Sequence, residues 1–170
     1  MESFKHNPFF TRVLKNIDRS IKKEEYIDWV LEKALPVYEK ELFCERALVI
    51  KMERGRNFPL SMKMVYPDPA LNGNVLYFKQ VFKAIPISAI EFLGSSFEDK
   101  LPLSWEMGGN EFFHIFTLKD YGYLVLLKKD GRLQDAILEC LNEVNDKLAE
   151  ACRQAVEIPS YTKGKYIKYI

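Results

Sequence analysis

The stretch that decides the fold is Leu133–Val156, LQDAILECLNEVNDKLAEACRQAV. Charged residues dominate one side of it, and small or apolar residues recur on the other at spacings of 4, 3, 4, 3 and 4, the heptad pattern of an amphipathic helix. These recurring residues are Ile137, Leu141, Val144, Leu148, Ala151 and Ala155. We expect a long helix that packs on its own domain and leaves it with a narrower apolar strip, suited to a dimer contact. An ordinary core helix is the alternative, because the pattern is short.

The composition indicates one globular domain. Of the 170 residues, 48 % are hydrophobic and 14 % aromatic, which suffices for a core and argues against disorder. The 25 basic and 24 acidic residues give a net charge of +1, so we expect no nucleic-acid partner. Neither a signal-peptide pattern nor an apolar window long enough for a membrane span occurs. We therefore expect a soluble, cytoplasmic protein.

The cysteines and histidines predict neither a disulfide nor a metal site. Cys140 and Cys152 lie on the predicted helix about 18 Å apart, beyond the reach of a disulfide. Together with Cys44 they are expected to be reduced thiols. Only two histidines are present, His6 and His114, so no Cys/His set has zinc spacing. We expect no metal site and no catalytic residues, and the sequence does not identify a cofactor.

Helical periods also occur earlier in the chain. The predicted helices cover residues 8–21, 23–42, 71–85 and 87–93. Asn7 and Pro8 suit a helix start, because proline fits the first helical position. Pro36 lies within the second helix, where it costs a backbone hydrogen bond, so we expect a bend or a break near Leu35.

Five segments have strand patterns with turn signals between them. They are residues 46–53, 60–66, 101–107, 111–118 and 121–128. The first two form a predicted hairpin, with Met64 and Tyr66 on one face. The last, YGYLVLLK, is almost wholly apolar and is expected at the centre of the sheet. Helices that are separate from hairpin-connected strands predict an α+β fold with a mostly antiparallel sheet.

This order of elements resembles that of the GAF domain over residues 22–156. The stretch Phe116–Val156, and within it NDKLAEAC at Asn145–Cys152, is similar to the last strand and C-terminal helix of GAF domains in bacterial sensor histidine kinases. The resemblance implies a central sheet of five to six strands, with N- and C-terminal helices on one face and short pocket helices on the other. Residues 1–21 then form an N-terminal helix. Residues 157–170 form a mobile basic tail, a linker remnant or a strand that docks elsewhere.

The resemblance implies a sensory or regulatory module of a bacterial signal-transduction protein, a sensor histidine kinase of a two-component system. A small molecule would lie between the sheet and the helices of residues 71–93. The terminal helix would pass the signal to an output domain, in a homodimer formed through the terminal helices. No histidine that could accept phosphate follows Val156 and no ATP-binding region is present, so we expect no enzyme activity from the chain itself.

Five residues are candidates for lining the ligand pocket. Aromatic side chains with a polar group suit the stacking and anchoring of a planar ligand. His114 is predicted to donate a hydrogen bond to the ligand if it shares a face with Phe112 and Phe116. The candidates are Tyr66, Tyr77, Phe78, Trp105 and His114. Core packing is the alternative role for the aromatics, and a semi-buried structural role the alternative for His114.

Two other functions remain open. One is a structural dimerisation module whose pocket is filled by its own aromatic side chains. The other is a thiol-dependent reductase of a small sulfoxide, in which Cys44 would be essential.

Overall fold

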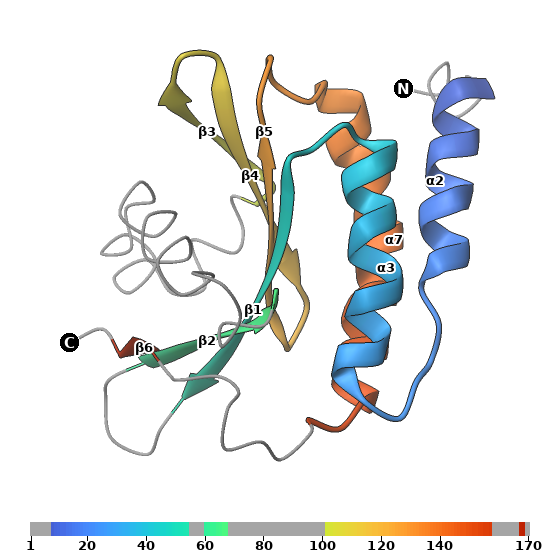
Figure 1. The fold of residues 1–170 in the computed structure, drawn as a ribbon, viewed down its shortest axis with the longest axis vertical. Helices are drawn as coiled ribbons and strands as arrows, with labels where there is room; N and C mark the ends of the chain where they lie inside the picture. The colour runs from blue at the N-terminus through green and yellow to red at the C-terminus, as the bar shows by residue number, and fades with distance from the viewer. Residues whose placement is uncertain (1–7, 55–59, 68–100, 158–166, 169–170) are drawn as a thin grey trace.

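The computed structural model describes residues 8–54, 60–67, 101–157 and 167–168. These residues form a six-stranded antiparallel sheet and three helices that lie on one side of it (Figure 1). The helices are α2 (Pro8–Ser20), α3 (Ile27–Glu41) and α7 (Asp135–Gln154). The strands are β1 (Arg46–Arg54), β2 (Leu60–Tyr66), β3 (Leu103–Gly108), β4 (Glu111–Leu118), β5 (Gly122–Lys128) and β6 (Ile167–Lys168). Their order across the sheet is β3-β4-β5-β1-β2-β6.

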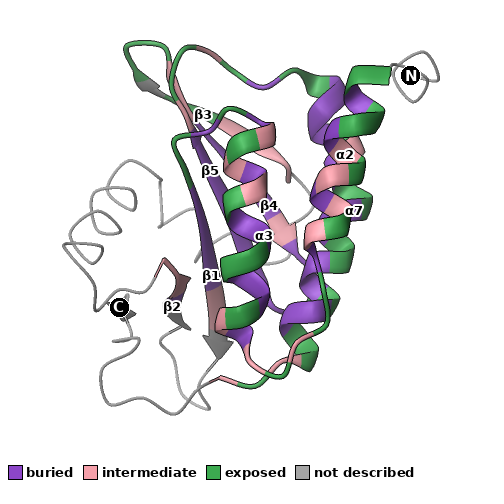
Figure 2. Ribbon diagram, turned by 45° about the vertical axis from the view of Figure 1, so that its right-hand side comes forward, coloured by how far each residue is buried: buried purple, intermediate pink, exposed green. Residues whose placement is uncertain are grey.

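The helices form two layers over the sheet. α3 and α7 lie next to the strands, and α2 covers the outer side of this pair (Figure 1). Buried residues gather on the central strands and on the inner sides of the helices (Figure 2). The apolar period of each helix therefore faces the interior, as amphipathic patterns predict.

One core cluster joins the helices to the first face of the sheet, which we call the helix face. Alternate strand residues point into it, because successive side chains of a strand point to opposite faces. Its strand members include Ala47, Val49, Phe116, Leu118, Leu124 and Leu126. Its helix members include Val13, Ile17, Leu31, Leu35, Leu141 and Leu148. Each fully buried leucine, isoleucine or valine stabilises the fold by about 1.5–3 kcal/mol relative to exposure.

The predicted α+β class and antiparallel sheet are confirmed. β1 and β2 form the expected hairpin, and β5 lies at the centre, between β4 and β1. The turn residues Asn110 and Asp120 have positive φ angles of 66° and 60°, as short polar residues in tight turns tolerate. Pro8 begins α2, as predicted.

Of the bend or break predicted near Leu35, the break does not occur. α3 continues through Pro36, whose side chain is exposed. Among the alternatives for residues 157–170, Ile167–Lys168 match the docked strand. They form β6 and pair with Ser61 and Met62 of β2.

The pocket helices predicted at 71–85 and 87–93 lie outside the described residues. Within the described ranges, no helix has an apolar stretch of the length and composition needed to cross a bilayer.

Candidate functional site

The predicted pocket residues do not meet at one place. His114 and Tyr66 lie on the helix face, whereas Trp105 lies on the opposite face, which we call the second face. Trp105 pairs directly with Phe113 in the β3–β4 ladder, and directly paired residues of an antiparallel sheet share a face. Tyr77 and Phe78 lie outside the described residues. The structure therefore does not bring His114 and Tyr66 together with Trp105, and the pocket itself stays a prediction.

His114 is a buried structural residue of β4. It is 0 % exposed and shares its face with Phe112, whose ring stacks on the imidazole with centroids 6.4 Å apart. Its Nδ1 lies 2.8 Å from Ser104 Oγ on β3. The backbone N–H of Leu133, just before α7, donates to Nε2 over 3.2 Å. Phe112 and Phe116 do share a face with it, but that face is covered by helices.

These partners fix the protonation state of His114. Since Nε2 accepts a hydrogen bond from Leu133, the proton of the neutral ring is on Nδ1, which donates to Ser104. Burial, with smaller contributions from the positive charges of Arg132 and Lys128, lowers the pKa of His114 to about 4. The ring is therefore neutral at pH 7 and holds β3 to the start of α7.

Tyr66 leaves the predicted face because β2 contains a bulge. Val49 of β1 pairs with Tyr66, but the next residue, Ile50, pairs with Met64, so the register shifts by one residue. As a result Val65 and Tyr66 both pack against the helix-face core, and Met64 is buried on the second face. Burial raises the pKa of the Tyr66 hydroxyl, with a further contribution from the Glu39 carboxylate of α3.

The second face is apolar and largely buried along its centre. Its buried residues include Leu48, Ile50, Phe113, Ile115, Tyr123 and Val125. Trp105, at 37 % exposure, is the most accessible large apolar side chain on this face among the described residues. An indole beside a buried phenylalanine suits contact with a planar apolar ligand.

The heptad residues of α7 are core residues rather than an exposed dimer strip. Ile137, Leu141, Val144, Leu148 and Ala151 are buried within the single chain, and Ala155 is partly buried against the same cluster. The reason is that α2, α3 and the sheet already cover this side of α7. These residues are therefore not available to a second chain in this structure, and the core-helix interpretation describes them better.

A buried polar pair joins α3 to α7 inside this core. The Tyr38 hydroxyl donates to Asn145 Oδ1 over 2.8 Å, and both residues are almost fully buried. Burial raises the pKa of Tyr38 well above its usual value, so the hydroxyl keeps its proton. Asn145 Nδ2 has no hydrogen-bond partner within the described structure.

Backbone hydrogen bonds and one nearby ion pair hold the C-terminal end of α7. We call this set of contacts the exit clamp. Val156 N–H donates to Glu25 O over 2.8 Å, and Ile27 N–H donates to Val156 O over 3.0 Å. The ion pair joins Lys51 Nζ of β1 to Glu157 Oε1 over 2.8 Å. The exit clamp therefore connects the end of α7 to both the start of α3 and the sheet.

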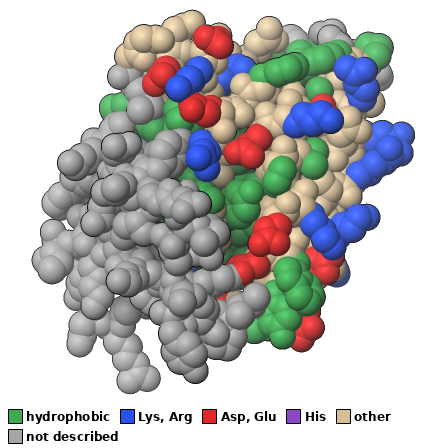
Figure 3. Space-filling view, in the orientation of Figure 1, with side chains coloured by type: hydrophobic (Ala, Val, Ile, Leu, Met, Phe, Trp, Pro, Cys, Tyr) green, Lys and Arg blue, Asp and Glu red, His purple; other side chains and the backbone are tan. Residues whose placement is uncertain are grey.

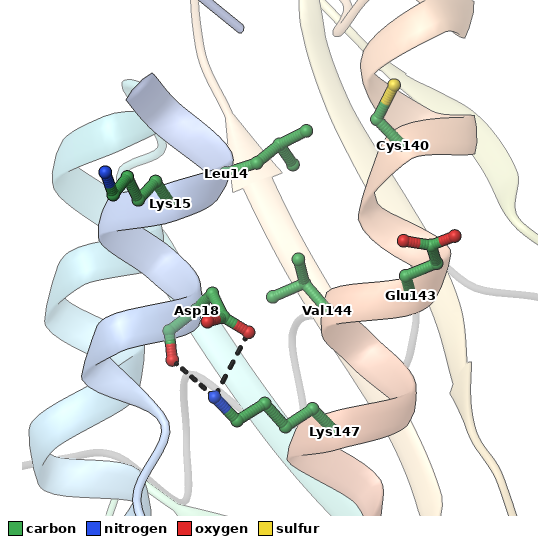
Figure 4. A pocket seen from close by; sticks show the side chains of 7 residues that line it. All are labelled: Leu14, Lys15, Asp18, Cys140, Glu143, Val144 and Lys147. Carbon is green, nitrogen blue, oxygen red and sulfur yellow. Dashed lines mark hydrogen bonds and ion pairs between the residues drawn. The ribbon is translucent and has the colours of Figure 1, made fainter. Parts of the chain in front are cut away.

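A groove of about 410 Å³ separates α2 from α7. Leu14 and Val144 point toward one another across it (Figure 4). At one end Lys147 Nζ binds Asp18 Oδ1 over 3.1 Å and the Asp18 backbone oxygen over 3.0 Å, so the two helices are joined there. The remaining lining residues are Lys15, Cys140 and Glu143.

The thiols have little nucleophilic character where they are buried. Burial raises the pKa of Cys44 and of Cys152 to about 12, so both are protonated at neutral pH. Cys140 is partly exposed, and all three are free thiols. Within the described ranges no three His, Cys, Asp or Glu side chains are placed to hold a metal ion.

Sequence reasoning missed the exit clamp and the α2–α7 groove. Both bring together residues more than 100 positions apart, and backbone partners such as Glu25 and Val156 leave no signal in residue type. No protein-family model matches this chain, and a comparison with curated proteins gives no match.

Proposed function

We propose that this chain is a sensory module of a bacterial signal-transduction protein, a sensor histidine kinase, and that it acts as a homodimer. The resemblance to GAF domains supplies this class. The observation that carries the proposal is the exit clamp, because it ties the C-terminal end of α7 to a strand of the sheet. A change in the sheet can therefore reach the end of α7 directly.

The path for such a signal is short. Leu48 and Ile50 of β1 are buried on the second face, and the neighbouring Lys51 holds Glu157. A small molecule bound at the second face would displace β1 or its side chains and so bias the position of Glu157. A ligand shifts such an equilibrium only by its difference in affinity for the two positions.

Native mass spectrometry of the purified protein tests whether a small molecule is bound. An additional small mass that disappears under denaturing conditions is the expected result. The chain offers a matched pair of variants, because its only two tryptophans lie on different elements. Trp105→Ala on the second face should lose the additional mass, whereas Trp29→Ala, 44 % exposed on α3, should keep it. Equal retention of the additional mass by both variants would show that Trp105 is not part of the ligand site.

A ligand-free structural module is the second candidate. The observation that favours it is the packing of the second face, where Leu48, Phe113 and Val125 are at most 1 % exposed. Absence of any additional mass, with unchanged stability of Trp105→Ala, would favour this candidate.

The sulfoxide reductase is the least supported proposal. Its attacking group would have to be a thiolate, and burial keeps Cys44 protonated. Turnover of a small sulfoxide that is lost in Cys44→Ala would support it.

A further inference from the structure

We infer that two oppositely charged stripes on α2 and α7 form the surface through which a second copy of this chain docks. The inference rests on the proposed function only in taking the chain to be a homodimer. The basic stripe consists of Arg12, Lys15 and Arg19 of α2 and Lys22, two residues after its end. The acidic stripe consists of Glu139, Glu143, Asp146 and Glu150.

Both stripes are exposed and lack ion-pair partners in the part of the chain that the structure describes. All eight side chains are exposed to solvent, and Lys and Arg side chains gather along the side of the molecule where α2 lies (Figure 3). The other charged side chains on these helices already have partners. Asp18 of α2 is paired with Lys147 of α7, and Arg153 donates to the backbone oxygen of Lys119. The helix surfaces are therefore left with opposite net charge.

The residues of the two stripes occupy matching positions along the axes of α2 and α7. Asp18 contacts Lys147, and one turn earlier Leu14 and Val144 face each other across the groove, so α2 and α7 run in the same direction (Figure 4). Lys15 and Glu143 line the same groove. One turn further, Arg19 is level with the segment from Asp146 to Glu150, since a helix rises by about 5.4 Å per turn.

This arrangement is self-complementary. A two-fold axis parallel to the helices places α2 of one copy over α7 of the other and preserves the height of every residue along the axis. The basic stripe of each copy then meets the acidic stripe of its partner, twice by symmetry. Leu14, which is partly exposed and lines the groove between the stripes, supplies an apolar contact at the centre of this surface. Exposed charges of this kind set orientation and specificity more than affinity, so we expect a dimer that weakens with salt.

Charge reversal with heterodimer rescue tests the inference. The first variant carries Arg12→Glu, Lys15→Glu and Arg19→Glu. The second carries Glu139→Lys, Glu143→Lys and Glu150→Lys. Each variant alone places like charges opposite each other in both halves of the interface. Sedimentation equilibrium should therefore show a dimer dissociation constant raised at least about tenfold over the wild type. An equimolar mixture should form heterodimers of wild-type affinity, since both halves are then complementary.

The controls separate this docking mode from simpler effects. Glu106→Lys and Lys119→Glu reverse exposed charges away from the stripes and should leave dimerisation unchanged. Far-UV circular dichroism identifies a triple variant that has lost its fold, and the single changes Lys15→Glu and Glu143→Lys then repeat the test.

Three results would overturn the inference. They are a wild type that stays monomeric at all concentrations, variants that keep wild-type affinity, and a mixture that does not associate. A monomer that binds polyglutamate through α2 would reassign the basic stripe to an acidic partner. A monomer that retains a small mass in native spectra would overturn the inference and leave the sensor function standing. A rescued heterodimer without any such mass would support the inference and contradict the sensor function.

Discussion

His114 couples the stability of the protein to pH. In the folded chain its pKa is about 4, against an ordinary value of 6.5. The unfolded state therefore binds a proton at a higher pH than the folded state does. The free energy of unfolding that this residue contributes is complete above pH 6.5 and is lost as the pH falls toward 4.

We expect His114→Gln to remove this pH dependence. The shift of the His114 pKa corresponds to about 3 kcal/mol lost between pH 6.5 and 4 in the wild type. Urea denaturation across this range measures it. The comparison uses the difference between wild type and variant, because carboxylates titrate equally in both. Parallel pH profiles for the two proteins would contradict the assigned role of His114.

The Tyr38–Asn145 pair allows a second test at a single site. Tyr38→Phe leaves the buried Asn145 oxygen without its donor, which should lower the free energy of unfolding by about 1–3 kcal/mol. The double variant Tyr38→Phe with Asn145→Leu removes both polar groups and should recover part of that loss. Denaturation of the two single variants and the double variant gives the coupling energy. Additive losses would show that the hydrogen bond contributes nothing.

At the scale of elements, α7 derives its position from the core of its own chain. Leu148 is 0 % exposed and belongs to the cluster that joins α2, α3 and the sheet. Leu148→Ala should therefore destabilise the isolated chain by about 2–5 kcal/mol. Gln154→Ala, at an exposed position of the same helix, is the matched control. Thermal unfolding measured at several protein concentrations distinguishes this loss from a weakened dimer, whose midpoint would depend on concentration.

The positions of the main strands could be predicted from the sequence, but the face of the sheet that the helices cover could not. Apolar runs and turn residues determine where each of the five main strands lies, and the structure has them there. Alternation along β4 predicts that His114 and Phe116 share a face, yet it carries no information about which face the helices cover. The bulge at Val65 and Tyr66 reverses the alternation at the end of β2. Such a bulge depends on the partner strand.

Close backbone contacts are hidden from sequence reasoning for the same reason. A Cβ atom on Gly122 would lie 1.8 Å from the Ile50 backbone oxygen, so only glycine fits there. Nothing in the sequence YGYLVLLK indicates that requirement. The charge stripes are an intermediate case, since their residue spacing is visible in the sequence. Their relation to each other depends on how α2 and α7 pack.

For the whole molecule, the packing of α2 decides whether residues 8–21 are an appendage or part of the domain. Phe10, Val13, Ile17 and Ile21 are buried in the cluster that also holds α3 and α7. α2 is further joined to α7 by the Asp18–Lys147 pair and to α3 by a 2.9 Å hydrogen bond from Asn16 to Glu41. These contacts argue that the helix is an integral layer of the fold.

A chain that begins at Lys22 should therefore be markedly less stable than the full chain. Removing residues 8–21 exposes the apolar side chains of α3 and α7 beneath α2. Each of the four buried side chains in this segment contributes about 1.5–3 kcal/mol, offset by the entropy that the helix regains. We expect a lower urea midpoint, a single shared transition in the full chain, and stronger binding of a hydrophobic dye by the shortened one. Ile17→Ala in the full chain should show a smaller loss in the same direction. An unchanged midpoint for the shortened chain would mean that the remaining helices and sheet form a complete core without α2.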